Sequence, residues 1–265
     1  MLTLTNIEKT FFPGTVNEKR ALNNLSLHLE QGDFVCIIGS NGAGKSTLLN
    51  AVSGEFLPDS GKIELAGKDI TFLPDYKRAK EIGRLFQDPM RGTAPHMTIE
   101  ENLSLAYLRA SGKSSPFRLI GKKERSLFCE QLARLELGLE DRMTQPVGLL
   151  SGGQRQALTL LMATVVTPKL LLLDEHTAAL DPATAEKVLA LTQRIVQESN
   201  ITCLMVTHNM ESALAVGNRT VMMDDGKILL DLQGEERARM TVDGLLEQFR
   251  EKSGARINND RMLLS

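Results

Sequence analysis

The sequence predicts an α/β fold with a mostly parallel sheet, an N-terminal antiparallel β subdomain and a helical subdomain insert. Strand-like alternation fills the first forty residues. Short apolar runs later in the chain alternate with helical patterns, as in parallel sheets. Residues 97–167 between them have mainly helical spacing. At 265 residues the chain can bury one core and a smaller lobe, because single domains usually hold about 100 to 200 residues.

The N-terminal part is read as strands around one helix. A Pro-Gly turn at Pro13 and Gly14 separates the first two strands, and Gly54 closes the helix. In chain order, we expect strands LTLTNIEKTF, ALNNLSLHL and DFVCII, a helix in KSTLLNAVSG, a strand pair in GKIELAGKDI, and a strand IGRLFQ that ends at Gln87.

The helical insert begins at a capping box formed by Thr98 and Glu101. We expect helices in ENLSLAYLRA, KKERSLFCEQLARLEL and SGGQRQALTLLMATVV. The stretch SGKSSPFRLIGK is rich in Gly, Ser and Lys, which predicts a mobile connection.

The rest of the chain returns to alternating strands and helices. Asp181 is expected to cap a helix with proline at its first position, and Asp225-Gly226 is a hairpin turn. The expected elements are strand KLLLLDE, helix DPATAEKVLALTQRIVQES, strand ITCLMVTH, helix NMESALAVG, hairpin RTVMMDDGKILLDL, helix VDGLLEQFREK and a polar tail. We therefore divide the chain into a main domain, residues 1–235, and a short C-terminal helix and tail, residues 236–265.

Composition excludes several classes. Hydrophobic residues make up 42% and charged residues 24%, as in ordinary globular proteins, and the net charge of −2 gives no basic field for nucleic acid. Cys36, Cys129 and Cys203 lack metal-ligand spacing and are read as thiols in a reducing compartment. No signal peptide is evident, and no apolar run approaches the ~18 residues that a membrane span needs. We expect a cytoplasmic protein.

The segment GSNGAGKST matches the phosphate-binding P-loop, G-x-x-x-x-G-K-[ST], and lies between a predicted strand and helix. Its glycines let backbone N–H groups face a phosphate, Lys45 offers a positive charge, and the Ser46 hydroxyl can ligate Mg²⁺. The sequence thus predicts a P-loop NTPase core that binds ATP and Mg²⁺. The expected nucleotide contacts are Gly39, Ser40, Asn41, Gly42, Ala43, Gly44, Lys45, Ser46 and Thr47.

Polar side chains follow three of the other predicted strands. Asp174 can hold the water shell of Mg²⁺, and Glu175, one residue later, can polarise an attacking water. Gln87 can reach the metal or that water, and a neutral His208 can hydrogen-bond a γ-phosphate oxygen. Each is an ordinary strand-end residue by itself; their occurrence beside a P-loop favours the catalytic reading.

A second phosphate-binding pattern stands in LLSGGQRQALTL. Ser151 and Gln154 form a capping-box pair, which is enough to explain a well-started helix. Gly152 and Gly153, however, cost about 1 kcal/mol each in helix propensity, and they leave N–H groups uncovered. A helix N-terminus of this kind binds anions. Since the P-loop already serves one nucleotide, we assign this site to the nucleotide of another molecule.

The ordered set GSNGAGKST, LFQD, LSGGQRQ, LLLLDE, AALD and MVTH resembles the ATP-binding subunit of ABC transporters over about residues 1–235. The resemblance implies that two such subunits pack head to tail. Ser151, Gly152, Gly153 and Gln154 of one copy would then close over ATP held by Lys45 of the other.

The resemblance also implies roles for single residues. Glu175 looks like the catalytic base, Asp174 and Gln87 like the Mg²⁺ and water contacts, and His208 like the switch histidine. Asp181 looks like the acid that crosses the dimer.

Two further positions bear on the resemblance. Phe11 stands where an aromatic side chain stacks on adenine, with Phe12 as the alternative. His176 stands where proline is commonest in the family, which should loosen that turn without removing either carboxylate.

The same resemblance implies partners. The helical subdomain would dock separate membrane permease subunits, with residues 87–102 forming part of the groove. The run QDPMRGTAPHMTIEENL is similar to bacterial importers of the tryptophan/tyrosine type, which implies a substrate-binding protein and a place on the inner face of the cell membrane. The expected function is an ATPase motor for uptake of a small solute such as an amino acid, working as a homodimer without nucleic acid.

Two other classes remain open from the sequence alone. A soluble ABC ATPase acting on DNA or the ribosome usually has two nucleotide domains, zinc motifs or long coiled coils, and none is present. A P-loop kinase would leave Glu175 and the second glycine pair unexplained. Export instead of import also stays open, because nothing in a motor subunit specifies direction.

Overall fold

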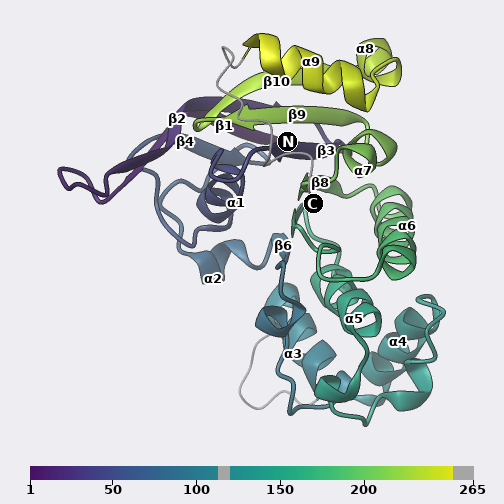
Figure 1. Cartoon of the computed structure of the whole chain (residues 1–265). Helices are drawn as coiled ribbons and strands as arrows, with labels where there is room; N and C mark the ends of the chain where they lie inside the picture. Colours follow the sequence, from purple (N-terminus) through teal and green to yellow (C-terminus); the bar gives the residue numbers. More distant parts are fainter. Residues whose placement is uncertain (113–119, 253–265) are drawn as a thin grey trace. The chain divides into compact units, whose positions relative to one another are not determined.

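The structure, a computed structural model, describes residues 1–112 and 120–252 (Figure 1). Most of the expected mobile connection and the polar tail lie outside the described residues. Contacts divide the chain into two units, which we describe separately. The first unit comprises Met1–Arg78 and the chain from Thr202 onward, and the second comprises Ala79–Ile201. This division differs from the predicted boundary at residue 235, which stays a prediction.

An antiparallel sheet in the first unit has the strand order β2-β1-β4-β5. Alternate side chains of β1, such as Leu2 and Leu4, are buried, which is the pattern of a sheet with one face on the core. This is the predicted N-terminal β subdomain. Its strands are β1 (Leu2–Phe11), β2 (Lys19–Leu29), β4 (Ser60–Leu65) and β5 (Lys68–Asp69).

The second group of strands in the first unit contains β3, which is parallel to both β8 and β9. β3 and β8 are buried along their whole length, so their apolar residues run without alternation. Strand β10 pairs antiparallel with β9 through a tight turn with φ of 45° at Asp225 and 72° at Gly226, as expected for this hairpin. The bounds are β3 (Phe34–Gly39), β8 (Thr202–Val206), β9 (Arg219–Asp224) and β10 (Lys227–Gln233).

Five helices complete the described part of the first unit: α1 (Lys45–Ser53), α2 (Asp75–Arg78), α7 (Met210–Ala215), α8 (Gly234–Ala238) and α9 (Val242–Lys252). The amphipathic α9 buries Leu245 and Phe249, as its pattern predicts. Helix α2 was not predicted. Its buried Arg78 donates to the carbonyl oxygens of Ala51 and Val52 near the end of α1, both at 2.9 Å.

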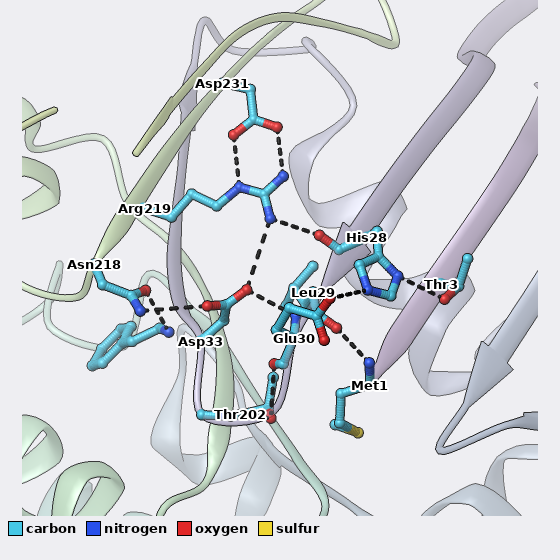
Figure 2. A network of polar contacts seen from close by, with 12 residues as sticks. Met1, Thr3, His28, Leu29, Glu30, Asp33, Thr202, Asn218, Arg219 and Asp231 are labelled. Atoms are coloured by element: carbon cyan, nitrogen blue, oxygen red, sulfur yellow. Dashed lines mark hydrogen bonds and ion pairs between the residues drawn. The ribbon is translucent and has the colours of Figure 1, made fainter. Parts of the chain in front are cut away.

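Arg219 joins the two sheets of the first unit (Figure 2). Its guanidinium donates to both carboxylate oxygens of Asp231 on β10, at 2.7 and 2.5 Å, and to the carbonyl of His28 on β2 at 2.6 Å. Asp33, in the turn before β3, lies 3.8 Å away. The carboxylates raise the pKa of Arg219, first of all the hydrogen bond to Asp231. One side chain thus links β2, β9 and β10.

The second unit contains two parallel strands and four described helices. The strands are β6 (Ile82–Leu85) and β7 (Leu170–Asp174). The helices are α3 (Ile99–Ser111), α4 (Lys122–Ala133), α5 (Gly152–Thr164) and α6 (Pro182–Glu198), with 3-10 turns η1 (Pro89–Gly92), η2 (Glu140–Arg142) and η3 (Val147–Leu149).

Most starts of these elements agree with the prediction, but several ends do not. Thr98 and Glu101 make both bonds of the capping box that begins α3, and the Asp181 side chain caps α6. Strand β6 ends at Leu85, two residues before Gln87, and α4 ends at Ala133 although its apolar spacing continues. The predicted α/β class is confirmed, with its antiparallel N-terminal sheet and parallel-rich core strands.

The three cysteines are free thiols, as expected. Cys36 on β3 and Cys203 on β8 are buried, and Cys129 on α4 is exposed. Burial raises the pKa of Cys36 to about 12, so this thiol stays protonated.

Candidate nucleotide site

The P-loop connects β3 to α1 and requires glycine for two reasons. Gly39, Gly42 and Gly44 have φ of 150°, 87° and 102°, which residues with a side chain rarely adopt. A Cβ on Gly39 would lie 2.2 Å from the Met223 carbonyl oxygen, and one on Gly44 would lie 2.5 Å from that of Ala21. The loop glycines therefore allow close packing as well as the turn.

Lys45 begins α1 and is only 5% exposed. Its ammonium donates to the carbonyl oxygens of Gly39 at 2.7 Å and Ser40 at 3.0 Å, both within the loop. No side chain caps α1, because its N-cap is Gly44. The first N–H groups of this helix and the Lys45 ammonium therefore converge on the inside of one loop, which suits a phosphate.

The β9–β10 hairpin contacts the P-loop, and the sequence pattern did not indicate this contact. The hydroxyl of Ser40 lies 3.3 Å from a carboxylate oxygen of Asp224, and the Gly226 N–H donates to the Ala43 carbonyl at 3.0 Å. No motif marks the hairpin as part of a nucleotide site; only the pairing of β9 with β3 places it there.

His208 lies at the same end of the parallel strands as the P-loop. Val206 of β8 is the register partner of Ile37 of β3, and the Thr207 N–H donates to the Ile37 carbonyl at 3.1 Å. His208 and Gly39 each follow this pair by two residues. The half-exposed His208 is thus placed beside the start of the loop, as strand-end reasoning predicts.

The two candidate adenine contacts differ in surroundings. The Phe11 ring meets the Phe56 ring edge to face at 5.4 Å between centroids, whereas Phe12 is 67% exposed and has φ of 52°. The choice between them stays a prediction. Lys19, which the sequence analysis missed, pairs with Phe11 across the sheet, and its ammonium lies 3.2 Å from where a Cβ on Gly42 would be.

In the second unit, the ends of β6 and β7 bring three predicted residues to one sheet edge. Leu85 and Leu173 are register partners in these parallel strands. Gln87 and Glu175 each follow that pair by two residues, and Asp174 is the last residue of β7. An amide and two carboxylates therefore occupy the edge where ligands of open α/β sheets bind.

Glu175 has a left-handed backbone with φ of 46°. A residue with a side chain pays about 1 kcal/mol or more for this conformation, and such strain is concentrated at functional sites. The Ala178 N–H donates to the Glu175 carbonyl at 3.0 Å and closes a turn. The chain therefore turns away from the extended path of β7 at Glu175, a feature that sequence reasoning did not foresee.

His176 is buried at 3% exposure, and its Nε2 lies 3.2 Å from the Thr192 hydroxyl of α6. Burial lowers the pKa of His176 to about 4, so the ring is neutral at physiological pH. The sequence predicts a looser turn at His176, but it does not predict this hydrogen bond to Thr192, which connects the turn to α6.

The capping box predicted at the start of α5 is present. The Ser151 hydroxyl accepts from the Gln154 N–H and the Gln154 side chain accepts from the Ser151 N–H, both at 3.2 Å. Gly152 is exposed, as expected for an anion site. A Cβ on Gly153 would lie only 2.3 Å from the Thr184 methyl group of α6. Gly153 is therefore also required for helix packing.

The starts of α5 and α6 lie side by side in the second unit. Asp181 accepts from the Thr184 N–H at 3.1 Å, and the hydrogen bonds to Thr184 lower the pKa of Asp181. Ser151, Gly153, Gln154 and Thr184 line one cavity of about 690 Å³. The second glycine site and the Asp181 turn are thus neighbours.

The proposed Mg²⁺ donors fit that ion chemically. Ser46 is exposed in the first turn of α1, and Gln87 and Asp174 lie at the second unit's sheet edge. All three offer oxygen, the donor that Mg²⁺ prefers. Within residues 1–112 and 120–252, no three His, Cys, Asp or Glu side chains form a metal-binding group. No described helix is long and apolar enough to cross a membrane.

Known proteins are similar to this chain over most of its length. A family model described as ABC transporter matches residues 22–178. A tyrosine transport ATP-binding protein of Clostridioides difficile is 46% identical over 250 residues, which cover 94% of this chain and 98% of that protein. A methionine import ATP-binding protein of Enterococcus faecalis is 36% identical over 86% of this chain and 64% of its own length.

A solved ATP-binding cassette is also similar. It is a dimer in a post-hydrolysis state bound to ADP and phosphate, with 30% identity and a TM-score of 0.75 over 88% of this chain and 98% of that chain.

Proposed function

The chain belongs to the ABC transporter family as an ATP-binding subunit that hydrolyses ATP to power transport, and on this premise we propose that it drives uptake of an amino acid of the tyrosine or tryptophan kind. The 46% identity over nearly the whole length of a tyrosine transport protein supports this substrate class. The methionine import relative supports the inward direction.

We assign the chemistry to the residues that the sequence singled out. The P-loop N–H groups and the Lys45 ammonium bind the phosphates of ATP. Glu175 accepts a proton from the water that attacks the γ-phosphorus, and the bond to the β–γ bridging oxygen breaks to give ADP and phosphate. His208 hydrogen-bonds the γ-phosphate. When bound, Mg²⁺ supplies positive charge to the phosphate oxygens, and Ser46, Gln87 and Asp174 are its proposed ligands.

The observation that carries the assembly is the open start of α5. Gly152 is exposed next to Ser151, which is the N-cap of α5, and Gly153 packs against α6. We propose that this helix end binds the γ-phosphate of ATP on a second copy, so that two copies pack head to tail. Asp181, beside it, contacts the same partner.

The remaining partners follow from the family. We propose that separate membrane permease subunits dock on the helical part, residues 97–167, and on residues 87–102, and that a substrate-binding protein delivers the solute. The chain would then work on the inner face of the cell membrane.

Mixing two inactive variants tests the composite site. Lys45→Ala removes the P-loop charge, and Gly152→Asp places a carboxylate where a phosphate should bind, so each homodimer should be inactive. A mixed dimer retains one intact pair, the P-loop of one chain and the α5 start of the other. ATPase activity of the mixture should therefore rise well above the sum of the separate variants, and no rise would reject trans action.

A further inference from the structure

The loop immediately before the exposed start of α5 is held by one side chain of that helix, Arg155. Its guanidinium donates to the carbonyl oxygens of Val147 at 3.4 Å, Gly148 at 3.1 Å and Leu150 at 2.9 Å. We call residues 147–150 the clamped loop. Three of its four carbonyl groups are thus bound by a side chain five to eight residues later.

The opposite side of the clamped loop is tied to a different segment. The N–H groups of Val147 and Gly148 donate to the carbonyl oxygens of Met97 and Pro95, at 3.0 and 2.9 Å. A Cβ on Gly148 would approach the Pro95 oxygen to 3.1 Å, so the backbones are close. The side-chain hydrogen bonds of Arg155 connect the clamped loop to α5.

The path of the clamped loop sets the orientation of Ser151. Ser151 is the N-cap of α5 and has φ of −63° and ψ of 163°, outside the helical region. The conformation of Ser151 depends on the position of the Leu150 carbonyl group, and this carbonyl accepts the shortest of the Arg155 hydrogen bonds. The Arg155 N–H also donates to the Ser151 carbonyl at 2.9 Å as the first bond of the helix. Arg155 therefore binds the carbonyl groups of both the N-cap and the residue before it.

We propose that Arg155 is a positioning residue, which holds the clamped loop so that Ser151 and Gly152 meet the γ-phosphate of the nucleotide on a second copy. This inference rests on the proposed head-to-tail function and adds the residue that prepares its second half-site. Arg155 touches no nucleotide in this role. Because Arg155 already orders the loop in the separate subunit, the loop loses less conformational entropy when the dimer closes.

The chemistry of the clamp selects arginine. A planar guanidinium has five N–H donors in a fixed fork, which suits three carbonyl groups at one time. A lysine ammonium has three donors on a flexible chain, and it can satisfy only part of this set with less fixed geometry. The Lys variant should therefore keep part of the function.

The clamped loop has both buried and exposed residues, and Val147 and Leu150 are its buried ones. The clamped loop exposes Leu149 at 75%, and Ser151 and Gly152 after it are also exposed. The Gly148 carbonyl, whose bond to Arg155 is exposed, can be hydrated when Arg155 is replaced. We therefore expect the defect in the assembled dimer and not in the separate subunit.

The experiment compares Arg155→Ala and Arg155→Lys with the matched control Arg239→Ala, which removes a surface ion pair to Glu235 at 2.8 Å. ATP affinity of the monomer should stay within twofold of the unchanged chain for all three. The ATPase rate should fall at least tenfold for Arg155→Ala and less for Arg155→Lys, and it should not change for Arg239→Ala. An unchanged rate in Arg155→Ala would overturn the proposal.

Mixing with Lys45→Ala separates a positioning role in trans from a local structural role. In a mixed dimer of Lys45→Ala and Arg155→Ala, one P-loop faces an intact clamp, so activity should rise above the sum of the two variants. If Gly152→Asp is rescued by Lys45→Ala but Arg155→Ala and Arg155→Lys are not, the clamp proposal fails while the proposed function stands. If Gly152→Asp is not rescued either, the composite site fails and the clamp proposal with it.

Discussion

Gly153 illustrates how one residue serves two requirements. From the sequence, the glycine pair indicated uncovered N–H groups at a helix start. The structure adds a packing reason, since the Thr184 methyl group occupies the space of a Gly153 side chain. Gly152 has more room, with the nearest atom at 3.2 Å on the Leu180 side chain. The two adjacent glycines are therefore not equivalent.

Gly153→Ala should destabilise the protein by about 1 to 3 kcal/mol, because overpacking forces neighbouring groups to move. The 2.3 Å approach to the Thr184 methyl group causes the clash. Thr184→Ser removes that methyl group and keeps the backbone N–H that Asp181 binds. The double variant should regain most of the loss in urea unfolding, and no recovery would show that the contact is not the cause.

His176 should make stability depend on acidity. Its pKa is lowered from 6.5 to about 4 in the folded chain, so the unfolded chain binds more protons between these values. Stability is fully present above pH 6.5 and falls as the pH approaches 4. The loss is at most about 3 kcal/mol, since each pKa unit corresponds to about 1.4 kcal/mol.

The measurement is urea unfolding of the nucleotide-free protein from pH 7 to pH 4. His176→Gln should lose this part of the decline, whereas His96→Gln, at an exposed position, should retain it. If His176→Gln shows the same decline as the unchanged chain, the buried ring is not its source.

At the scale of elements, long segments were predictable and short ones were not. The strands β3, β7 and β8 follow from continuous apolar runs, because both of their faces are buried. Helix α2 has four residues, too few for a period to appear. Helix α4 ends at Ala133 although Leu135 continues its apolar spacing, and the left-handed backbone of Glu136, with φ of 58°, is incompatible with a longer helix.

Arg219 offers a test of how elements are joined in the first unit. Arg219→Ala removes the bonds to Asp231 and His28 and leaves two carboxylates without their shared cation. Because charged hydrogen bonds contribute about 1.5 to 3 kcal/mol each at most, we expect a loss of about 2 to 3 kcal/mol in urea unfolding. The folded variant should bind ATP normally, since Arg219 begins β9 and the P-loop lies at its other end.

Arg20→Ala is the matched control for this variant. It removes an ion pair with Glu8 in which both side chains are well exposed, and such pairs contribute at most about 1 kcal/mol. Equal losses in Arg20→Ala and Arg219→Ala would mean that the network of Figure 2 does not hold the strands together.

At the scale of the whole molecule, the proposed dimer makes a direct prediction for Glu175→Gln. Without a general base, ATP should bind but not be hydrolysed, so the closed dimer should accumulate. Light scattering with ATP and Mg²⁺ should show conversion from monomer to dimer, and ADP release should fall by at least about a hundredfold, the usual contribution of a general base.

Glu186→Gln, at an exposed position on α6, is the control and should turn over normally. A Glu175→Gln protein that hydrolyses ATP at the normal rate would remove Glu175 from the role of base. One that binds ATP but stays monomeric would instead contradict the proposed assembly.

The sequence by itself determined the family and the α/β class, and it located the P-loop between β3 and α1. It did so because these depend on local patterns: glycine spacing around Lys45, capping boxes at Thr98 and Ser151, and apolar runs that mark buried strands. The acidic pair at the end of β7 was found in the same way, and the structure places Gln87 at the same edge. The catalytic roles of these residues stay predictions.

Only the tertiary structure decided which distant groups support those motifs. The Met223 carbonyl behind Gly39 and the Asp224 carboxylate beside Ser40 come from strands about 180 residues away in sequence. Arg155 lies close in sequence to its carbonyl partners, yet its proposed role depends on the path of the short turn η3 and of Leu150 after it. Periodicity describes neighbours along one element, whereas these contacts depend on strand pairing and loop geometry, which no local pattern encodes.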